Sequence, residues 1–238
     1  MPMVGLFIAV TGASSGVGRA IAETFAEAGA SVVALGRDRE RLASVAAHRT
    51  GRIDGIAGDL TDASTMDAVV NQIVGQGRSL DVLVHAAGII ARGSIAASSL
   101  DDFDRQMLTN VRVPYALTRA LLPSLVATAG YVVFINSSSG MHASAGTGAY
   151  AATKHALRAL ADALREEVNA SGIRVLSVYL GQTATPMQRA IYVDAGKPYD
   201  PDRLIQPSDI AAIILSVVSL PASVEVTDMT LRPTKKPI

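Results

Sequence analysis

The sequence predicts an α/β fold in which a mostly parallel, doubly wound sheet of seven strands carries helices on both faces. Two observations lead to this class. Short runs rich in Val and Ile alternate with longer Ala- and Leu-rich segments along almost the whole chain. The short runs are nearly continuous in apolar residues, as is typical of parallel strands covered on both faces. Repeated strand–helix–strand units require right-handed crossovers, and these produce a doubly wound sheet.

Each element follows from this alternation. The expected strands are Gly5–Val10, Ser31–Leu35, Ile53–Ala57, Asp81–Val84, Tyr131–Ile135, Arg174–Tyr179 and Val224–Thr230. The expected helices are Val17–Ala28, Arg39–His48, Ser64–Gln76, Leu100–Thr128, Ala149–Ala170 and Ser208–Leu220. Asp62 and Ser208 are placed to cap helix starts, while Gly29 and Gly172 are placed to end helices in the left-handed conformation.

Composition narrows the possible functions. The 238 residues are 49% hydrophobic and contain no linker-like block, so residues 1–238 are expected to form a single domain. Twenty-one basic and 21 acidic residues cancel, which gives no reason to expect nucleic acid or an anionic membrane as partner. Cysteine is absent, and the four histidines lack metal-site spacing, so no metal is expected. With no signal peptide and no spanning segment, we expect a soluble cytoplasmic protein.

Residues 185–206 interrupt the alternating pattern. They hold three prolines and two tyrosines between a predicted strand and a predicted helix. Ligands of open α/β sheets bind beyond the carboxyl ends of the strands. An irregular insertion at this point predicts a lid over a substrate, and a plain surface loop is the alternative.

A glycine-rich turn follows the first predicted strand and opens the first helix. Its residues, Thr11-Gly-Ala-Ser-Ser-Gly-Val-Gly18, let the backbone turn tightly and approach a ligand without an intervening Cβ. The helix N-terminus then offers free amide groups and a positive dipole end to phosphates. The turn therefore predicts a site for a dinucleotide pyrophosphate, made by Gly12, Ser14, Ser15, Gly16, Val17 and Gly18.

The glycine spacing is Gly-x-x-x-Gly-x-Gly, and not the more familiar Gly-x-Gly-x-x-Gly. In this spacing the sequence resembles the single-domain subfamily of short-chain dehydrogenases/reductases, and the resemblance covers nearly the whole chain. It implies a Rossmann-like fold and an oxidoreductase that moves hydride between a nicotinamide cofactor and a carbonyl or secondary alcohol.

The end of the second predicted strand indicates which cofactor is used. NAD-binding folds usually place a carboxylate here to bind the ribose 2′-hydroxyl, but this chain has Gly36 followed by Arg37. Without a carboxylate to repel it, a 2′-phosphate can pair with the guanidinium. We therefore expect NADP(H) in preference to NAD(H), although Arg37 could also be a solvated residue beside Asp38.

The resemblance implies further cofactor contacts. Asp59 and Leu60, after the third strand, correspond to the family's adenine-binding pair, and the Ala87-Gly88 step after the fourth lies close to the cofactor. The preceding His85 replaces an asparagine of the family and is expected to be a satisfied strand-end histidine. After the sixth strand, the resemblance assigns nicotinamide contacts to Gly181, Thr183 and Thr185.

Tyr150 and Lys154 form the candidate proton-transfer pair. Four residues apart on a helix, they lie on one face, about one turn apart. A free phenol has a pKa of about 10, and a neighbouring ammonium is expected to lower it toward the useful range. In the family that this sequence resembles, a serine at this distance before the tyrosine holds the substrate oxygen, and Ser137 has that spacing. Asn110 matches the helix asparagine that maintains a water-linked proton path to the lysine.

Two other readings remain open. One is a non-catalytic NADP(H)-binding sensor, for which Tyr150→Phe should make no difference. The other is a sugar-nucleotide epimerase or dehydratase, although such chains usually carry a sizeable C-terminal substrate domain.

The substrate and the assembly are less defined. Candidate pocket residues for a small carbonyl or alcohol substrate are Met141, His142, Met187, Tyr192 and Tyr199. Family members commonly pair through the long helix that begins near Tyr150, so a homo-oligomer, tetramer or dimer, is expected. The Ala/Leu stripe of that helix (Ala156, Leu157, Leu160, Ala163 and Leu164) could equally face its own sheet.

Overall fold

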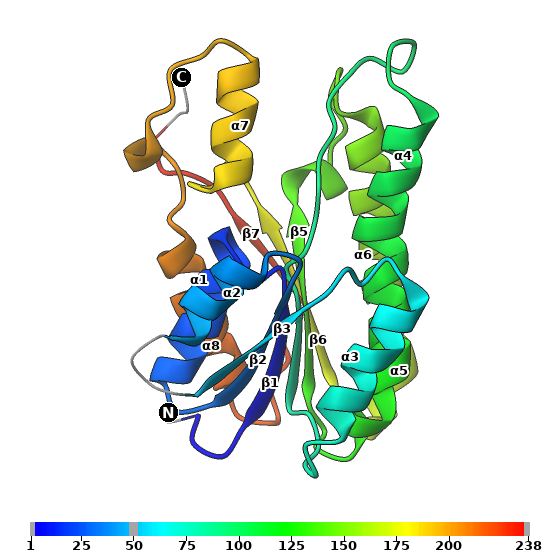
Figure 1. Ribbon diagram of the computed structural model, residues 1–238, viewed down its shortest axis with the longest axis vertical. Coiled ribbons are helices and arrows are strands. Elements are labelled where there is room, and N and C mark those ends of the chain that lie inside the picture. The colour runs from blue at the N-terminus through cyan, green and yellow to red at the C-terminus, as the bar shows by residue number, and fades with distance from the viewer. Residues whose placement is uncertain (1–2, 48–51, 236–238) are drawn as a thin grey trace.

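The computed structural model describes residues 3–47 and 52–235. These residues form a seven-stranded sheet in the order β3-β2-β1-β4-β5-β6-β7, and every neighbouring pair is parallel (Figure 1). The strands are β1 (Phe7–Thr11), β2 (Ser31–Gly36), β3 (Ile53–Ala57), β4 (Val82–His85), β5 (Tyr131–Ser137), β6 (Arg174–Leu180) and β7 (Asp228–Leu231). The expected fold class is confirmed, and the sheet is entirely parallel.

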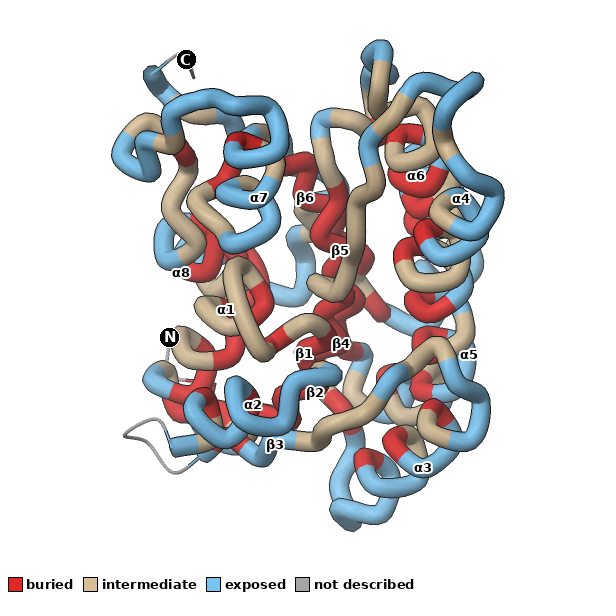
Figure 2. The backbone as a smooth tube through the Cα atoms, turned by 45° about the horizontal axis from the view of Figure 1, so that its top comes forward, coloured by how far each residue is buried: buried red, intermediate tan, exposed pale blue. Residues whose placement is uncertain are grey.

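Helices cover both faces of the sheet. They are α1 (Gly16–Glu27), α2 (Arg39–Ala46), α3 (Ala63–Val74), α4 (Leu100–Met107), α5 (Val113–Val126), α6 (Gly148–Val168), α7 (Pro186–Asp194) and α8 (Pro207–Val218). Alternate residues of each strand face opposite layers. In β1, Ile8 packs with α1 and α8, whereas Ala9 packs in the layer of α3, α5 and α6. Figure 2 shows the resulting buried strands between two partly exposed helical layers.

Most predicted boundaries lie within a few residues of the observed ones, and the local signals account for several of them. Asp62 caps α3 by accepting a hydrogen bond from the Thr65 amide at 2.7 Å. Gly29 and Gly172 adopt positive φ angles of 103° and 72°. The predicted end of the second helix, at His48, lies outside the described residues.

Three predictions were wrong in detail. Ser208 does not cap α8, because Pro207 takes the first helical position and Gln206 precedes it. The single helix expected over 100–128 is interrupted by a π-helical turn, Leu108–Arg112, between α4 and α5. Residues 185–206 are not simply irregular, since they contain α7 and a short 3-10 turn, Pro201–Arg203.

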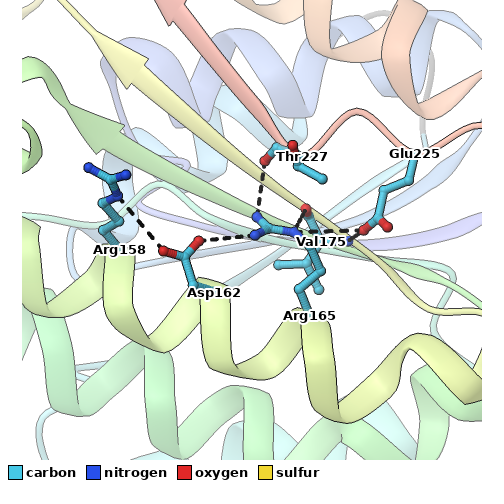
Figure 3. A network of polar contacts seen from close by, with 6 residues as sticks. All are labelled: Arg158, Asp162, Arg165, Val175, Glu225 and Thr227. Atoms are coloured by element: carbon cyan, nitrogen blue, oxygen red, sulfur yellow. Dashed lines mark hydrogen bonds and ion pairs between the residues drawn. The ribbon is translucent and has the colours of Figure 1, made fainter.

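A polar network joins α6 to the sheet edge (Figure 3). The Arg165 guanidinium, 14% exposed, donates to the carbonyls of Val175 and Thr227 and pairs with Asp162 at 3.0 Å. Glu225 accepts a hydrogen bond from the Val175 amide at 2.8 Å and lies 3.9 Å from Arg165. The network fixes the C-terminal half of α6 against β6 and the segment that leads into β7.

Across the described ranges, no helix is long and apolar enough to cross a bilayer.

Candidate active site

A cleft of about 300 Å³ lies at the carboxyl ends of the strands. In the sheet, β1 and β4 are neighbours, but the chain leaves β1 for one face and follows β4 toward the other. The strand order therefore reverses its direction between β1 and β4, and open α/β sheets bind their ligands at such a point. The cleft is lined from the ends of β1 to β6 and from the first turns of α1 and α7.

The glycine turn forms one wall of the cleft, and its geometry leaves no room for side chains. Gly12 has a φ of 67°, and a Cβ there would lie 2.7 Å from the Ala87 amide nitrogen. A Cβ on Gly18 would lie 2.5 Å from the Gly12 carbonyl oxygen. The Thr11 hydroxyl accepts hydrogen bonds from the amides of Ala86 and Ala87, each at 3.1 Å, and so ties this turn to the end of β4.

The N-terminus of α1 faces the same cleft. Its N-cap residue, Ser15, makes no side-chain capping bond. The first-turn amides therefore remain available to an anion, and the helix dipole favours negative charge there. All six predicted residues of the turn line the cleft: Gly12, Ser14, Ser15, Gly16, Val17 and Gly18.

Arg37 lies at the end of β2 and also lines the cleft. It is exposed, and the carboxylate of its neighbour Asp38 pairs instead with Arg41 at 3.1 Å. Asp38 therefore does not neutralise Arg37. A Cβ at Gly36 would come within 3.3 Å of the Ser14 side chain, so any side chain there would crowd this corner.

Beyond β3, Asp59 and Leu60 line the cleft as well. One Asp59 carboxylate oxygen accepts hydrogen bonds from the amide and the hydroxyl of Thr61, at 3.0 and 2.8 Å. The same wall includes Ala87 and Gly88 from the loop that follows β4.

Ser137, Tyr150 and Lys154 meet at the other end of the cleft, although two lie on α6 and one ends β5. Lys154 is 5% exposed, and its ammonium donates to the Ile135 carbonyl at 3.1 Å. The Lys154 nitrogen lies 5.8 Å from the centre of the Tyr150 ring. Burial lowers the pKa of Lys154 to about 8.

The pKa of Tyr150 differs from the sequence-based expectation. Burial raises it above its ordinary value, and the hydrogen bond with Ser137 only partly opposes this rise. The expectation that Lys154 lowers this pKa was wrong, because desolvation of the phenolate dominates and only the hydrogen bond with Ser137 opposes it. In this environment the Tyr150 phenol is protonated at neutral pH.

Asn110 does not line the cleft but stands directly behind its wall. It is buried in the π-helical turn, and its side-chain amide makes hydrogen bonds with both the amide and the carbonyl of Ile89, each at 2.9 Å. It also donates to the Thr153 hydroxyl at 3.1 Å. Ile89 lines the cleft, so Asn110 links the loop after β4 to the helix that carries Lys154.

Sequence reasoning missed two buried amides of this site. Asn136 lines the cleft, accepts from the Ser137 amide at 2.8 Å and donates to the Lys154 carbonyl at 3.2 Å. Gln106 is buried one turn before Asn110, and its side chain accepts from the Ala91 amide at 3.0 Å. The position of Asn136 beside Ser137 was a usable signal for the first, whereas nothing local distinguishes Gln106.

The remaining predicted residues divide into two groups. Thr183, Thr185 and Met187 line the cleft. Gly181, Met141, His142, Tyr192 and Tyr199 are not among the lining residues.

Each of the second group has other surroundings. Gly181 packs beneath Leu231, donating to its carbonyl at 2.8 Å. His142 is exposed, and the Met141 sulfur accepts a weak bond from a β7 hydroxyl. Tyr192 is 6% exposed and donates to the Gln182 side chain at 2.6 Å.

His85 lies away from the cleft, in the core between β4 and α5. Its Nε2 atom is 2.7 Å from the Thr118 hydroxyl, and its ring stacks on Phe134 at 5.0 Å. Burial lowers the pKa of His85 to about 3, so the ring is neutral at physiological pH. It is a buried strand-end histidine, but the expectation that it is satisfied holds only for Nε2, because Nδ1 has no partner among the described residues.

Known proteins are similar to this chain over most of its length. The family described as short chain dehydrogenase matches residues 7–195. A short-chain type dehydrogenase/reductase of Sinorhizobium fredii is 36% identical over 230 residues, covering 94% of this chain and 90% of that protein.

Two solved structures have the same fold. One is an alcohol dehydrogenase of the archaeon Thermococcus sibiricus complexed with 5-hydroxy-NADP. It is 25% identical with a TM-score of 0.88, and the match covers 98% of each chain. The other is a metagenomic short-chain oxidoreductase in complex with NADP, which is 28% identical with a TM-score of 0.85 and matches over 99% of this chain and all of that one.

A parallel doubly wound sheet with a glycine turn at its switch point defines a Rossmann-like α/β protein. The match over residues 7–195 and the 36% identity to the Sinorhizobium protein narrow this class further. The chain belongs to the short-chain dehydrogenase family, which is a family of oxidoreductases.

Proposed function

We propose that the chain is an NADP(H)-dependent oxidoreductase that interconverts a carbonyl compound and a secondary alcohol. The observation that carries the proposal is that Ser137, Tyr150 and Lys154 line the same cleft as the glycine turn. A protein that only senses the nucleotide needs no proton donor beside it. The complexes of the Thermococcus and metagenomic relatives with NADP-type nucleotides support the choice of cofactor.

The described residues fit such a nucleotide along the whole cleft. A pyrophosphate would meet the open amides of the first turn of α1, where Gly12 and Gly18 admit no Cβ. Asp59 would hold the adenine, and Thr183 and Thr185 would hold the carboxamide end. When bound, the nicotinamide supplies or accepts the hydride.

The protein's own part is proton transfer and positioning. The Tyr150 phenol donates its proton to the substrate oxygen during reduction, since burial keeps it protonated at neutral pH. Ser137 holds the same oxygen by a hydrogen bond and stabilises the developing negative charge. The Lys154 ammonium supports the phenolate that remains, and Asn110 keeps the loop behind it in place.

The preference for NADP(H) over NAD(H) rests on the end of β2. Arg37 has no ion pair with Asp38, and Gly36 presents no carboxylate to repel a 2′-phosphate. A guanidinium and a phosphate form strong charge-assisted hydrogen bonds. We expect Arg37→Ala to raise the KM for NADPH about tenfold or more and to leave the KM for NADH nearly unchanged.

We also propose that residues 185–206 close over the substrate, and that the single domain assembles with copies of itself. The first turn of α7 supports the lid, because Pro186, Met187 and Gln188 line the cleft. An apolar hollow on the outer side of α4, α5 and α6 supports the assembly, as it exposes 56% of Tyr115.

The decisive experiment follows NADPH oxidation with aldehydes, ketones and β-keto esters. Oriented proton transfer contributes about 10²–10⁴ in rate, so Tyr150→Phe should lose at least a hundredfold in kcat while still binding NADPH. The control is Tyr115→Phe, a phenol on α5 outside the cleft. Equal behaviour of the Tyr150→Phe and wild-type proteins, with NADPH bound and no turnover, would favour the sensor instead.

A further inference from the structure

The cleft has two electrostatically different ends. The charged side chains Arg37 and Asp59 follow β2 and β3, whereas Ser137 and Leu180 end β5 and β6. Neighbouring strands lie about 4.8 Å apart, so three strand spacings place the end of β5 about 14 Å from the end of β2. That separation exceeds the Debye length of about 8 Å at physiological ionic strength. Arg37 and Asp59 therefore contribute little at the catalytic end.

The catalytic end is lined by apolar and neutral polar side chains. The apolar ones are Ile89, Val113, Ile135, Leu180, Pro186 and Met187. The neutral polar ones are Thr109, Asn136, Thr183, Thr185 and Gln188, besides Ser137 and Tyr150. Of the described residues at this end, only Lys154 carries a charge, and its ammonium already donates to the Ile135 carbonyl.

Four charged residues lie near the mouth of the cleft without lining it. Arg232 follows β7 beside Gly181, and Lys235 is exposed three residues further on. Arg189, on α7, is directed onto the Tyr199 ring, with its guanidinium carbon 4.9 Å from the ring centre. Arg92 is exposed on the loop after β4, and neither it nor Arg189 lines the cleft. An apolar side chain, Ile95, is 92% exposed beside Gly148, two residues before Tyr150, and would touch a Cβ there at 3.6 Å.

We infer that the substrate is an uncharged carbonyl compound with an apolar group beside the carbonyl, and that the cleft discriminates against carboxylates and phosphates. The inference rests on the proposed function and adds the substrate class. A carboxylate placed against Leu180 and Met187 would lose its water without gaining a cation, which is costly. An ester of the same shape meets no such cost.

The test compares ester and acid forms of the same carbonyl skeleton, with NADPH present. The pairs are methyl 4-formylbenzoate with 4-formylbenzoate, and ethyl acetoacetate with acetoacetate. For the wild type, kcat/KM should favour the ester at least tenfold in each pair. An acid turned over as well as its ester would overturn the inference and leave the proposed reductase intact. Hydride transfer to neither member of either pair, with either nucleotide, would overturn both.

Two residues of α7 allow a matched charge test. Met187 lines the cleft and is 40% exposed, whereas Val193 is 69% exposed on the same helix and does not line it. Met187→Lys should raise kcat/KM for the acids and cut the ester-to-acid ratio at least fivefold, while Val193→Lys should leave that ratio unchanged. Met187→Gln separates charge from polarity and should leave the acids as poor substrates. The same gain from Gln as from Lys, or from Val193→Lys, would overturn the inference.

Discussion

Lys154 illustrates the conflict between stability and function within one side chain. Lys154 is 5% exposed, and its ammonium donates a hydrogen bond to the Ile135 carbonyl. Burial lowers the pKa of Lys154 to about 8, which means that the fold disfavours the charge. The proposed reaction nevertheless needs that charge beside Tyr150. The residue is therefore expected to cost stability at neutral pH.

Replacing Lys154 should reveal this cost in stability. Lys154→Met should abolish most activity and raise the free energy of unfolding at pH 7 by about 1–3 kcal/mol, less the loss of the hydrogen bond to Ile135. Between about pH 8 and 10.5, the unfolded wild type binds more protons than the folded one, so wild-type stability rises with pH. The advantage of the variant should shrink over that interval.

Urea denaturation at several pH values measures the difference. Lys197→Met serves as the control because Lys197 is exposed after α7, and its replacement should change little. A Lys154→Met protein that is less stable than wild type at pH 7 and at pH 10 alike would show that packing, and not charge, dominates at this site.

Helix spacing predicted that Tyr150 and Lys154 lie together, and the family resemblance added Ser137, but neither could give the direction of the Tyr150 pKa. That direction depends on desolvation by residues distant in the chain, and only the folded structure reveals it. Asn136 was missed for a similar reason. Its value to the site lies in its bond to the Lys154 carbonyl, 18 residues away.

Among the elements, α7 departs most from expectation. The start of this helix could have been predicted from the sequence. Thr185 is the N-cap and accepts a hydrogen bond from the Gln188 amide, and Pro186 occupies the first turn. The prolines that follow the helix led to the prediction of an irregular segment instead. The π-helical turn between α4 and α5 could not be predicted, because one extra residue shifts the phase of the hydrophobic pattern only once, and a short helical segment also shows such shifts without a π-turn.

The far end of α7 is held by a contact between side chains. Tyr192 donates to Gln182 at 2.6 Å, and its ring packs edge-on against Tyr199 at 5.6 Å. The Gln182 carbonyl in turn accepts from the Ile205 amide at 3.1 Å, closing the base of the 185–206 segment. By fixing the far end of α7, these contacts keep the whole helix, including its first turn, in place beside the cleft.

Tyr192→Phe should therefore loosen α7 without touching the reacting atoms. We expect the KM for the carbonyl substrate to rise severalfold, kcat to change less than twofold, and stability to fall by about 1 kcal/mol. Steady-state kinetics and urea denaturation measure these effects. Tyr199→Phe removes a hydroxyl from the same pair of rings and is the control. An equal change in KM from both variants would argue against the Tyr192–Gln182 contact.

At the scale of the whole molecule, the outer side of α4, α5 and α6 is the candidate surface for self-association. The Ala/Leu stripe of α6 is divided between two directions. Leu157 is buried against the sheet, while Leu160 lines the outer hollow together with Met107, Leu108, Val111, Arg112 and Tyr115. The sheet-facing reading therefore holds for Leu157, while Leu160 belongs to the surface proposed for self-association.

Light scattering after size-exclusion chromatography tests this surface. The wild type should elute as a dimer or tetramer, and Tyr115→Glu should shift it toward the monomer by placing a charge in the apolar hollow. Val74→Glu, on α3, adds the same charge at a residue that is 54% exposed and should leave the assembly intact. A monomeric wild type, or an unchanged Tyr115→Glu assembly, would rule out this surface.

The strand order also has a consequence for biosynthesis. During translation, β1, β2 and β3 can pair outward in one direction, but β1 gains its second neighbour only when β4 has emerged. From β4 onward, each new strand adds to the opposite edge of the growing sheet. The cleft lies between β1 and β4, where these two directions of growth meet, and it is lined from the ends of β1 to β6. We therefore expect a nascent chain to bind the nucleotide only after β6 has left the ribosome.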